Sequence, residues 1–171
     1  MNKYIKFFTL NFSFFILIGC GYKPSSVYQD KILGNNIKPI VEVDVKNPRE
    51  TIFLKDALND AIYTLLGKNV NTKNYDTIIK VDANSSSLTP IDYDENGFPY
   101  LYRSSVVLNV EIIDKNKKTY KYKVSGNYDF TISTNSVITD ETKLDAYKKA
   151  SINALNKLFA KITQEGIKQW L

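Results

Sequence analysis

The sequence contains no histidine and only one cysteine, at position 20. Catalytic triads and Cys–His nucleophile pairs need an imidazole, and Cys/His zinc sites need several such ligands. An internal disulfide needs a second thiol. The sequence also lacks a GxSxG nucleophile motif, a P-loop and a GxGxxG loop. Carboxylates and lysines remain, as a carboxylate hydrolase would use, but no pair of them is placed for catalysis. We therefore predict no catalytic residue, no metal site and no cofactor, and we expect a protein that is not an enzyme.

The chain also has little excess charge, because 23 lysine and arginine residues face 18 acidic residues, a net charge of +5. Nucleic-acid-binding surfaces need a stronger basic balance, so we predict no nucleic-acid partner. The N-terminal apolar run, residues 7–18, carries no charge. It is shorter than the roughly 20 residues that a membrane-spanning helix needs.

That apolar run belongs to a pattern typical of a secretory signal. Two lysines, at positions 3 and 6, precede it, and small residues follow it. It ends in Leu17-Ile18-Gly19-Cys20, which closely resembles the bacterial lipoprotein signal. The resemblance implies that residues 1–19 are removed, that the Cys20 thiol takes a diacylglyceryl group, and that its new amine is acylated. The alternative is an ordinary transmembrane anchor with a buried cysteine.

Cleavage before Cys20 leaves 152 of the 171 residues and removes two lysines, which lowers the net charge from +5 to +3. Several acyl chains hold a protein firmly on a bilayer. Gly21 stands where many inner-membrane lipoproteins have an aspartate, so we expect the periplasmic side of the outer membrane. Residues 20–36 are predicted to form a lipidated tether, and residues 37–171 a single domain.

Apolar residues in the predicted domain alternate with polar ones in some segments and recur at helical spacing in others. The first pattern predicts strands at 37–45, 75–83, 100–114 and 119–132. Residues 84–88 are predicted to form either a polar loop or an extension of the second strand. The second predicts helices from Asn47 to Gly67 and from Thr139 to about Gly166. Each long strand has one apolar face, which suits a sheet covered on one side. We therefore predict an α+β fold, a two-layer sandwich with two helices packed on one face of a mainly antiparallel four-stranded sheet.

Two short motifs invite a site assignment. Residues 92–97 match the first half of an EF-hand loop, but the twelfth position, which needs a bidentate glutamate, is Arg103. We predict a turn there, because Asp, Asn and Gly favour turns. Residues 82–86 match the acceptor pattern of bacterial periplasmic N-glycosylation at Asn84. Most matches to so short a pattern arise by chance.

Taken in order, the predicted elements resemble the LPS-assembly lipoprotein LptE family. The resemblance rests on Cys20-Gly21-Tyr22, the first strand and helix, residues 93–97 before Tyr102-Arg103, the strand from Tyr120 to Phe130, and the last helix. It implies a lipoprotein that plugs the LptD outer-membrane β-barrel. The pair would insert lipopolysaccharide or lipooligosaccharide into the outer leaflet, without cofactor or bond chemistry.

Candidate lipopolysaccharide contacts must be argued from charge, because the resemblance supplies no binding motif. Lysine suits phosphates and other anions as a mobile point charge. The densest cationic cluster lies on the predicted hairpin turn and the wet strand face after it: Lys115, Lys117, Lys118, Lys121 and Lys123. The alternative is a solvated turn that favours solubility.

A second function also fits the anchor and the small α/β domain. The protein would then be a periplasmic interaction lipoprotein of another envelope pathway, such as a cell-wall synthase activator or a barrel-assembly accessory. The partner that co-purifies in detergent distinguishes the two.

Overall fold

The structure, a computed structural model, describes residue 30 and residues 32–44, 47–133 and 136–168. The predicted signal peptide, Cys20 and the first part of the tether lie outside the described residues. Within these residues, the elements that build the domain follow in the order β1 (Asn36–Val41), α3 (Pro48–Leu66), β2 (Asn69–Val70), β3 (Thr77–Tyr93), β4 (Pro99–Ile113), β5 (Thr119–Thr131) and α4 (Asp140–Lys168).

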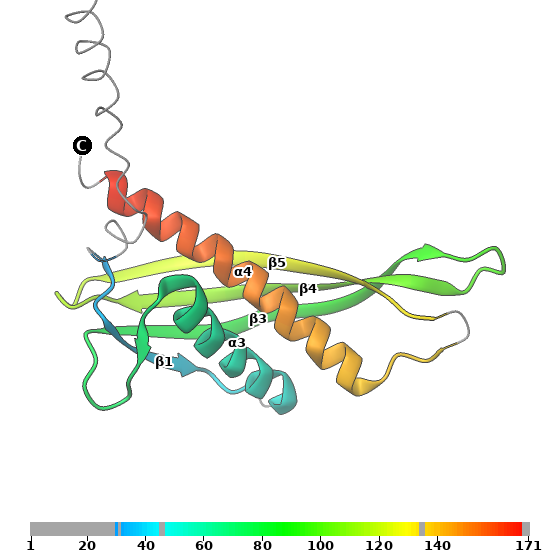
Figure 1. The fold of residues 1–171 in the computed structure, drawn as a ribbon, viewed down its shortest axis with the longest axis horizontal. Helices are drawn as coiled ribbons and strands as arrows, with labels where there is room; N and C mark the ends of the chain where they lie inside the picture. The colour runs from blue at the N-terminus through cyan, green and yellow to red at the C-terminus, as the bar shows by residue number, and fades with distance from the viewer. Residues whose placement is uncertain (1–29, 31, 45–46, 134–135, 169–171) are drawn as a thin grey trace, which may run out of the picture.

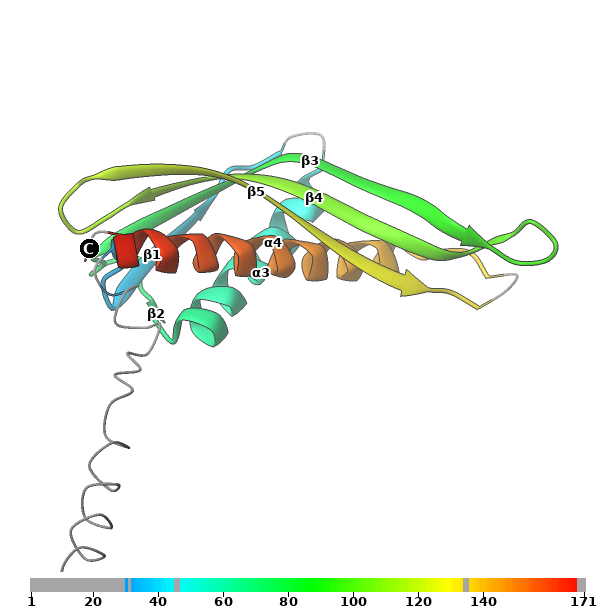
Figure 2. The ribbon, with the colours of Figure 1, turned by 90° about the horizontal axis from the view of Figure 1, so that it is seen from above.

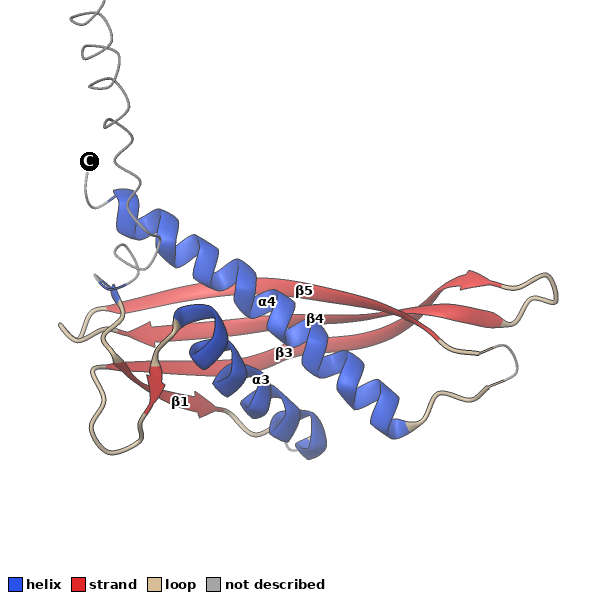
Figure 3. Ribbon diagram, in the orientation of Figure 1, coloured by secondary structure: helices blue, strands red, loops and turns tan. Residues whose placement is uncertain are grey.

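The strands form one mixed sheet of five strands in the order β2-β1-β3-β4-β5. β1 is parallel to both β2 and β3, whereas β4 is antiparallel to both of its neighbours, β3 and β5. Both helices lie on one face of this sheet (Figures 1 and 3). The predicted α+β class and the single covered face are therefore correct, and the prediction of four mainly antiparallel strands is wrong in detail. The helix α3 and the short strand β2 lie between β1 and β3 in the chain, and such a crossover allows β1 and β3 to be parallel.

The first strand is shorter than predicted, because it ends at Val41 instead of residue 45. After Val41, the Glu42 N–H still donates to the Val81 carbonyl of β3 at 3.0 Å. Val43, which the sequence placed on the buried face of the strand, is 68% exposed. Pro48 is the first residue of α3, and Gly67 ends that helix with a φ of 62°. Both helix boundaries were predicted, although the Asn47 side chain makes no capping hydrogen bond.

The core lies between the helices and the inner face of the sheet. It contains the predicted apolar stripes of both helices and the inward side chains of β3, β4 and β5. One predicted member, Leu65, is exposed instead. Ile32 and Leu33 are fully buried in the same core, although the sequence placed them in the tether. Two apolar residues without periodic neighbours carry no pattern, so their burial could not be predicted.

The last helix packs very close to β5 at Gly126. A Cβ atom on that glycine would lie 2.1 Å from the Ala150 carbonyl oxygen and 2.4 Å from the Ala154 nitrogen. Two α4 side chains also cover the outer edge of β5, since Asn153 donates to the Asn127 carbonyl and Lys157 to the Ser125 carbonyl, at 2.8 and 2.9 Å. The helix continues to Lys168, so the predicted break at Gly166 is wrong.

The third strand continues through residues 84–88 to Tyr93, so this segment is a strand extension and not a loop, and β3 is nearly twice as long as the predicted strand 75–83. A register shift between Ala83 and Ser85 leaves Asn84 as the extra residue of a bulge. Beyond it, β3 and β4 continue as a hairpin that extends past both helices (Figures 1 and 2). We call this hairpin, residues 88–104, the arm.

Candidate functional site

The two ends of the sheet carry different segments of the chain. At one end, the register places Ile37 of β1 beside Thr77, and Ile78 beside Ile113. The chain therefore joins the sheet at the same end as the β4–β5 turn, residues 114–118, which we call the basic turn. At the other end is the arm tip, residues 91–100 (Figure 1). The candidate lysines gather at and near the first end.

The basic turn is fixed by the buried carboxylate of Asp114. Its Oδ1 accepts the N–H groups of Asn116 and Lys118, both at 2.8 Å, and its carbonyl accepts the Lys117 N–H at 2.9 Å. Lys117 has a φ of 63°, which this network maintains. The Lys118 ammonium lies 5.0 Å from the centre of the Tyr120 ring. The side chains of Lys115, Lys117 and Lys118 remain exposed, so the turn presents three cations from a rigid backbone.

Lys121 and Lys123 lie on the helix-free face of the sheet, where they line a hollow of about 490 Å³. The register places Lys121 beside Glu111, and Lys123 beside Asn109. Glu111 is already paired with Lys80 at 3.4 Å. Within the described part of the chain, neither Lys121 nor Lys123 has an ion-pair partner of its own. Both ammonium groups are therefore free to meet an anion.

The hollow is not purely basic. Its other charged and amide side chains were not singled out from the sequence: Glu42, Lys80, Asp82, Asn109 and Glu111. Strand alternation places several of these on the wet face, but only the pairing register shows that they surround the two lysines. The structure thus brings Lys121 and Lys123 together and leaves Lys115, Lys117 and Lys118 on the neighbouring turn.

Two further carboxylates accept side-chain hydrogen bonds, Asp129 on the helix-free face of the sheet and Asp92 on the arm. Arg103 makes two hydrogen bonds of 2.7 Å to the Asp129 carboxylate, and these hold the pKa of Asp129 below its ordinary value. The Tyr100 hydroxyl donates to Asp92 at 2.7 Å, which lowers the pKa of Asp92 in the same way. Both carboxylates are therefore ionised at neutral pH.

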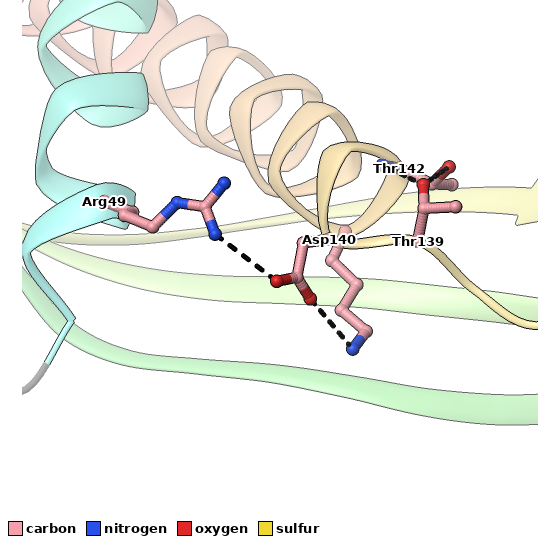
Figure 4. A network of polar contacts seen from close by, with 5 residues as sticks. Arg49, Thr139, Asp140 and Thr142 are labelled. Carbon is pink, nitrogen blue, oxygen red and sulfur yellow. Dashed lines mark hydrogen bonds and ion pairs between the residues drawn. The ribbon is translucent and has the colours of Figure 1, made fainter.

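A separate polar network joins the starts of the two helices (Figure 4). Asp140 pairs with Arg49 at 3.3 Å and with Lys143 at 3.4 Å. The Thr139 hydroxyl accepts the Thr142 N–H at 3.1 Å, as expected of the predicted cap. Arg49 and Lys143 are both paired with the Asp140 carboxylate, and Thr139 caps the N-terminus of α4. The network therefore stabilises the helix pair and is not a candidate ligand site.

The EF-hand-like segment forms a turn, as predicted. Asp94 Oδ1 accepts the N–H groups of Asn96 and Phe98 at 2.9 and 2.8 Å, so this oxygen already has two partners. Among the described residues, no three His, Cys, Asp or Glu side chains are grouped so that they could hold a metal ion. In the same part of the chain, no helix has the length and apolarity required to span a membrane.

Comparison with known proteins decides the family. A family model described as lipopolysaccharide-assembly, LptE, matches residues 40–162. The chain belongs to the LptE family. The match extends from the first strand into the last helix, so it includes the basic turn, the hollow and the arm. Members of this family are non-enzymatic lipoproteins, and membership supports a role in lipopolysaccharide assembly.

Solved structures show the same fold. The rare lipoprotein B from Shewanella oneidensis aligns with a TM-score of 0.50 and 10% identity, covering 80% of this chain and 100% of its own. A lipoprotein from Caulobacter crescentus aligns with a TM-score of 0.51 and 11% identity, covering 84% and 96%. No curated protein sequence matches the chain significantly.

Proposed function

We propose that this protein is an outer-membrane lipoprotein that forms a complex with an LptD-type β-barrel and assists the insertion of lipopolysaccharide or lipooligosaccharide into the outer leaflet. The family match over residues 40–162 carries the proposal. The lipoprotein signal ending at Cys20 supports it, because it anchors the domain on the periplasmic side of the membrane. Recovery of the barrel with the tagged protein tests it.

The position of the basic turn suits contact with a lipid anion. Nine residues separate Cys20 from Asp30, and when extended they span at most about 35 Å. The basic turn lies at the end of the sheet where the chain joins it. We therefore propose that Lys115, Lys117 and Lys118 face the anchoring membrane surface or lipopolysaccharide bound near it, and that Lys121 and Lys123 continue this contact into the hollow.

Replacing Lys115, Lys117 and Lys118 together with glutamine is expected to weaken the binding of purified lipopolysaccharide. Each exposed lysine contributes less than about 1 kcal/mol, but three together set a preference for anionic ligands. Folding should not change, because all three side chains lie outside the core. The measurement is a binding titration at low and high salt, and the difference from the parent should shrink as salt rises.

The matched control removes the same charge from the helices, by changing Lys55, Lys143 and Lys161 to glutamine. These side chains are also exposed. The control should bind as the parent does. Equal affinity of the parent and the basic-turn variant at low ionic strength would make that turn a solubility feature only.

A further inference from the structure

The arm tip exposes large apolar side chains that no described element covers. Ile91, Tyr93 and Phe98 are 39%, 53% and 54% exposed. They stand at the end of a hairpin that extends past both helices and past β5, whose last residue pairs with Leu101. Aromatic residues in such a position are typical of the anchors that fill a partner's pocket.

Hydrogen bonds hold this tip in one conformation. The Asp94 N–H donates to the Phe98 carbonyl at 2.8 Å, and the Gly97 N–H donates to the Asp94 carbonyl at 2.9 Å. Gly97 has a φ of 81°, which suits glycine. The Tyr100 hydroxyl bond to Asp92 holds the two strands together on the arm. A preorganised tip loses little conformational entropy on binding.

The charge of the tip argues for a protein rather than a lipid surface. Residues 82–102 contain no lysine or arginine, whereas Asp92, Asp94 and Glu95 lie at the turn. The next cation along β4, Arg103, is bound to Asp129. Segments that enter anionic membranes carry lysine or arginine beside their apolar residues, because carboxylates are repelled by lipid phosphates. A pocket on a protein, apolar inside and basic at its rim, complements the tip.

We propose that the arm tip docks into an apolar pocket on the barrel partner, with lysine or arginine side chains at the rim of that pocket. This inference rests on the proposed function and names the surface of the chain that contacts the barrel. The tip lies at the end of the sheet opposite the point where the tethered chain joins it (Figure 1). β4 alone spans about 50 Å, so the lipid anchor and the tip would contact well-separated places.

The test changes Ile91, Tyr93 and Phe98 to serine in the full-length tagged protein. The control changes Ile52 and Tyr63 to serine, because these α3 side chains are also large, apolar and exposed. Both proteins should be folded and lipidated. The tip variant should recover less than about a tenth of the barrel that the parent recovers from detergent extracts, and the control should recover as much as the parent.

A second variant, Glu95→Lys, tests whether the acidic tip meets lysine or arginine side chains on the barrel. It should lower barrel recovery several-fold at low salt, and the loss should shrink at high salt. If the parent recovers the barrel and the tip variant recovers it equally, the tip is not the contact and only this inference falls. If the parent recovers no barrel, the proposed function itself fails.

A lipid target is distinguished with the same proteins. Soluble forms without the anchor are mixed with vesicles of phosphatidylethanolamine, phosphatidylglycerol and lipopolysaccharide, and flotation is measured. We expect no binding that depends on the tip. Flotation of the parent domain that the serine changes abolish would assign the arm tip to the membrane and overturn the proposal.

Discussion

Replacing Cys20 with alanine is expected to abolish lipidation and to leave an uncut or soluble form of the protein. The thiol is the only one in the chain, so no other residue can take the diacylglyceryl group. Each buried CH₂ of an acyl chain contributes about 0.8 kcal/mol to membrane binding, so losing several chains removes the whole anchor. The measurement is incorporation of labelled palmitate, together with the fraction of protein that sediments with the outer membrane.

The matched control is Gly19→Ala, which keeps a small residue before the predicted cut and leaves the thiol in place. It should be labelled as the parent is. Equal labelling of parent and Cys20→Ala protein would contradict the lipid anchor. A parent that carries no label and sediments uncut with the inner membrane would favour the transmembrane alternative.

Replacing Gly126 with alanine is expected to destabilise the domain by about 3 kcal/mol, at the upper end of the usual cost of overpacking. The new Cβ would overlap the Ala150 carbonyl oxygen and the Ala154 nitrogen. These are backbone atoms of α4, so relief requires the whole helix to move away from β5. Domains of this size have about 5–15 kcal/mol of stability, so the loss is a large fraction of it. Urea denaturation of the soluble domain measures the change.

The control for this variant is Asn127→Ala, one residue along the same strand. The Asn127 side chain is exposed, and its backbone carbonyl still accepts the Asn153 hydrogen bond after the change. Its free energy of unfolding should stay within about 0.5 kcal/mol of the parent. If Gly126→Ala is equally mild, α4 does not lie as close to the sheet as described.

Much of the fold was predictable because a buried face makes apolar residues recur at the period of a strand or a helix. In β5, Tyr120, Tyr122 and Val124 face the helices while Lys121 and Lys123 face solvent, as the alternation predicts. Whether two strands pair parallel or antiparallel does not change this period, so the parallel pairing of β1 with β3 was missed. Residues 84–88 are mostly serine and asparagine and extend β3 only because β4 offers hydrogen-bond partners along its whole length.

The candidate site was only partly predictable for the same reason. The five lysines are close in sequence, so their clustering required no knowledge of the fold. The acidic and amide neighbours of Lys121 and Lys123 come from β3, from β4 and from Glu42 just after β1, and their placement depends on the pairing register. The arm tip was missed because residues 92–97 predict a turn, while the exposure of Tyr93 and Phe98 depends on where the helices end.

The most direct test of the proposed function is the identity of the partner recovered with the tagged, full-length protein from detergent-solubilised membranes. The Cys20→Ala variant controls for capture that does not depend on anchoring. We predict stoichiometric recovery of an LptD-type β-barrel that resists unfolding in detergent until heated. Recovery of a cell-wall synthase, or of no barrel at all, would contradict the assignment to lipopolysaccharide insertion.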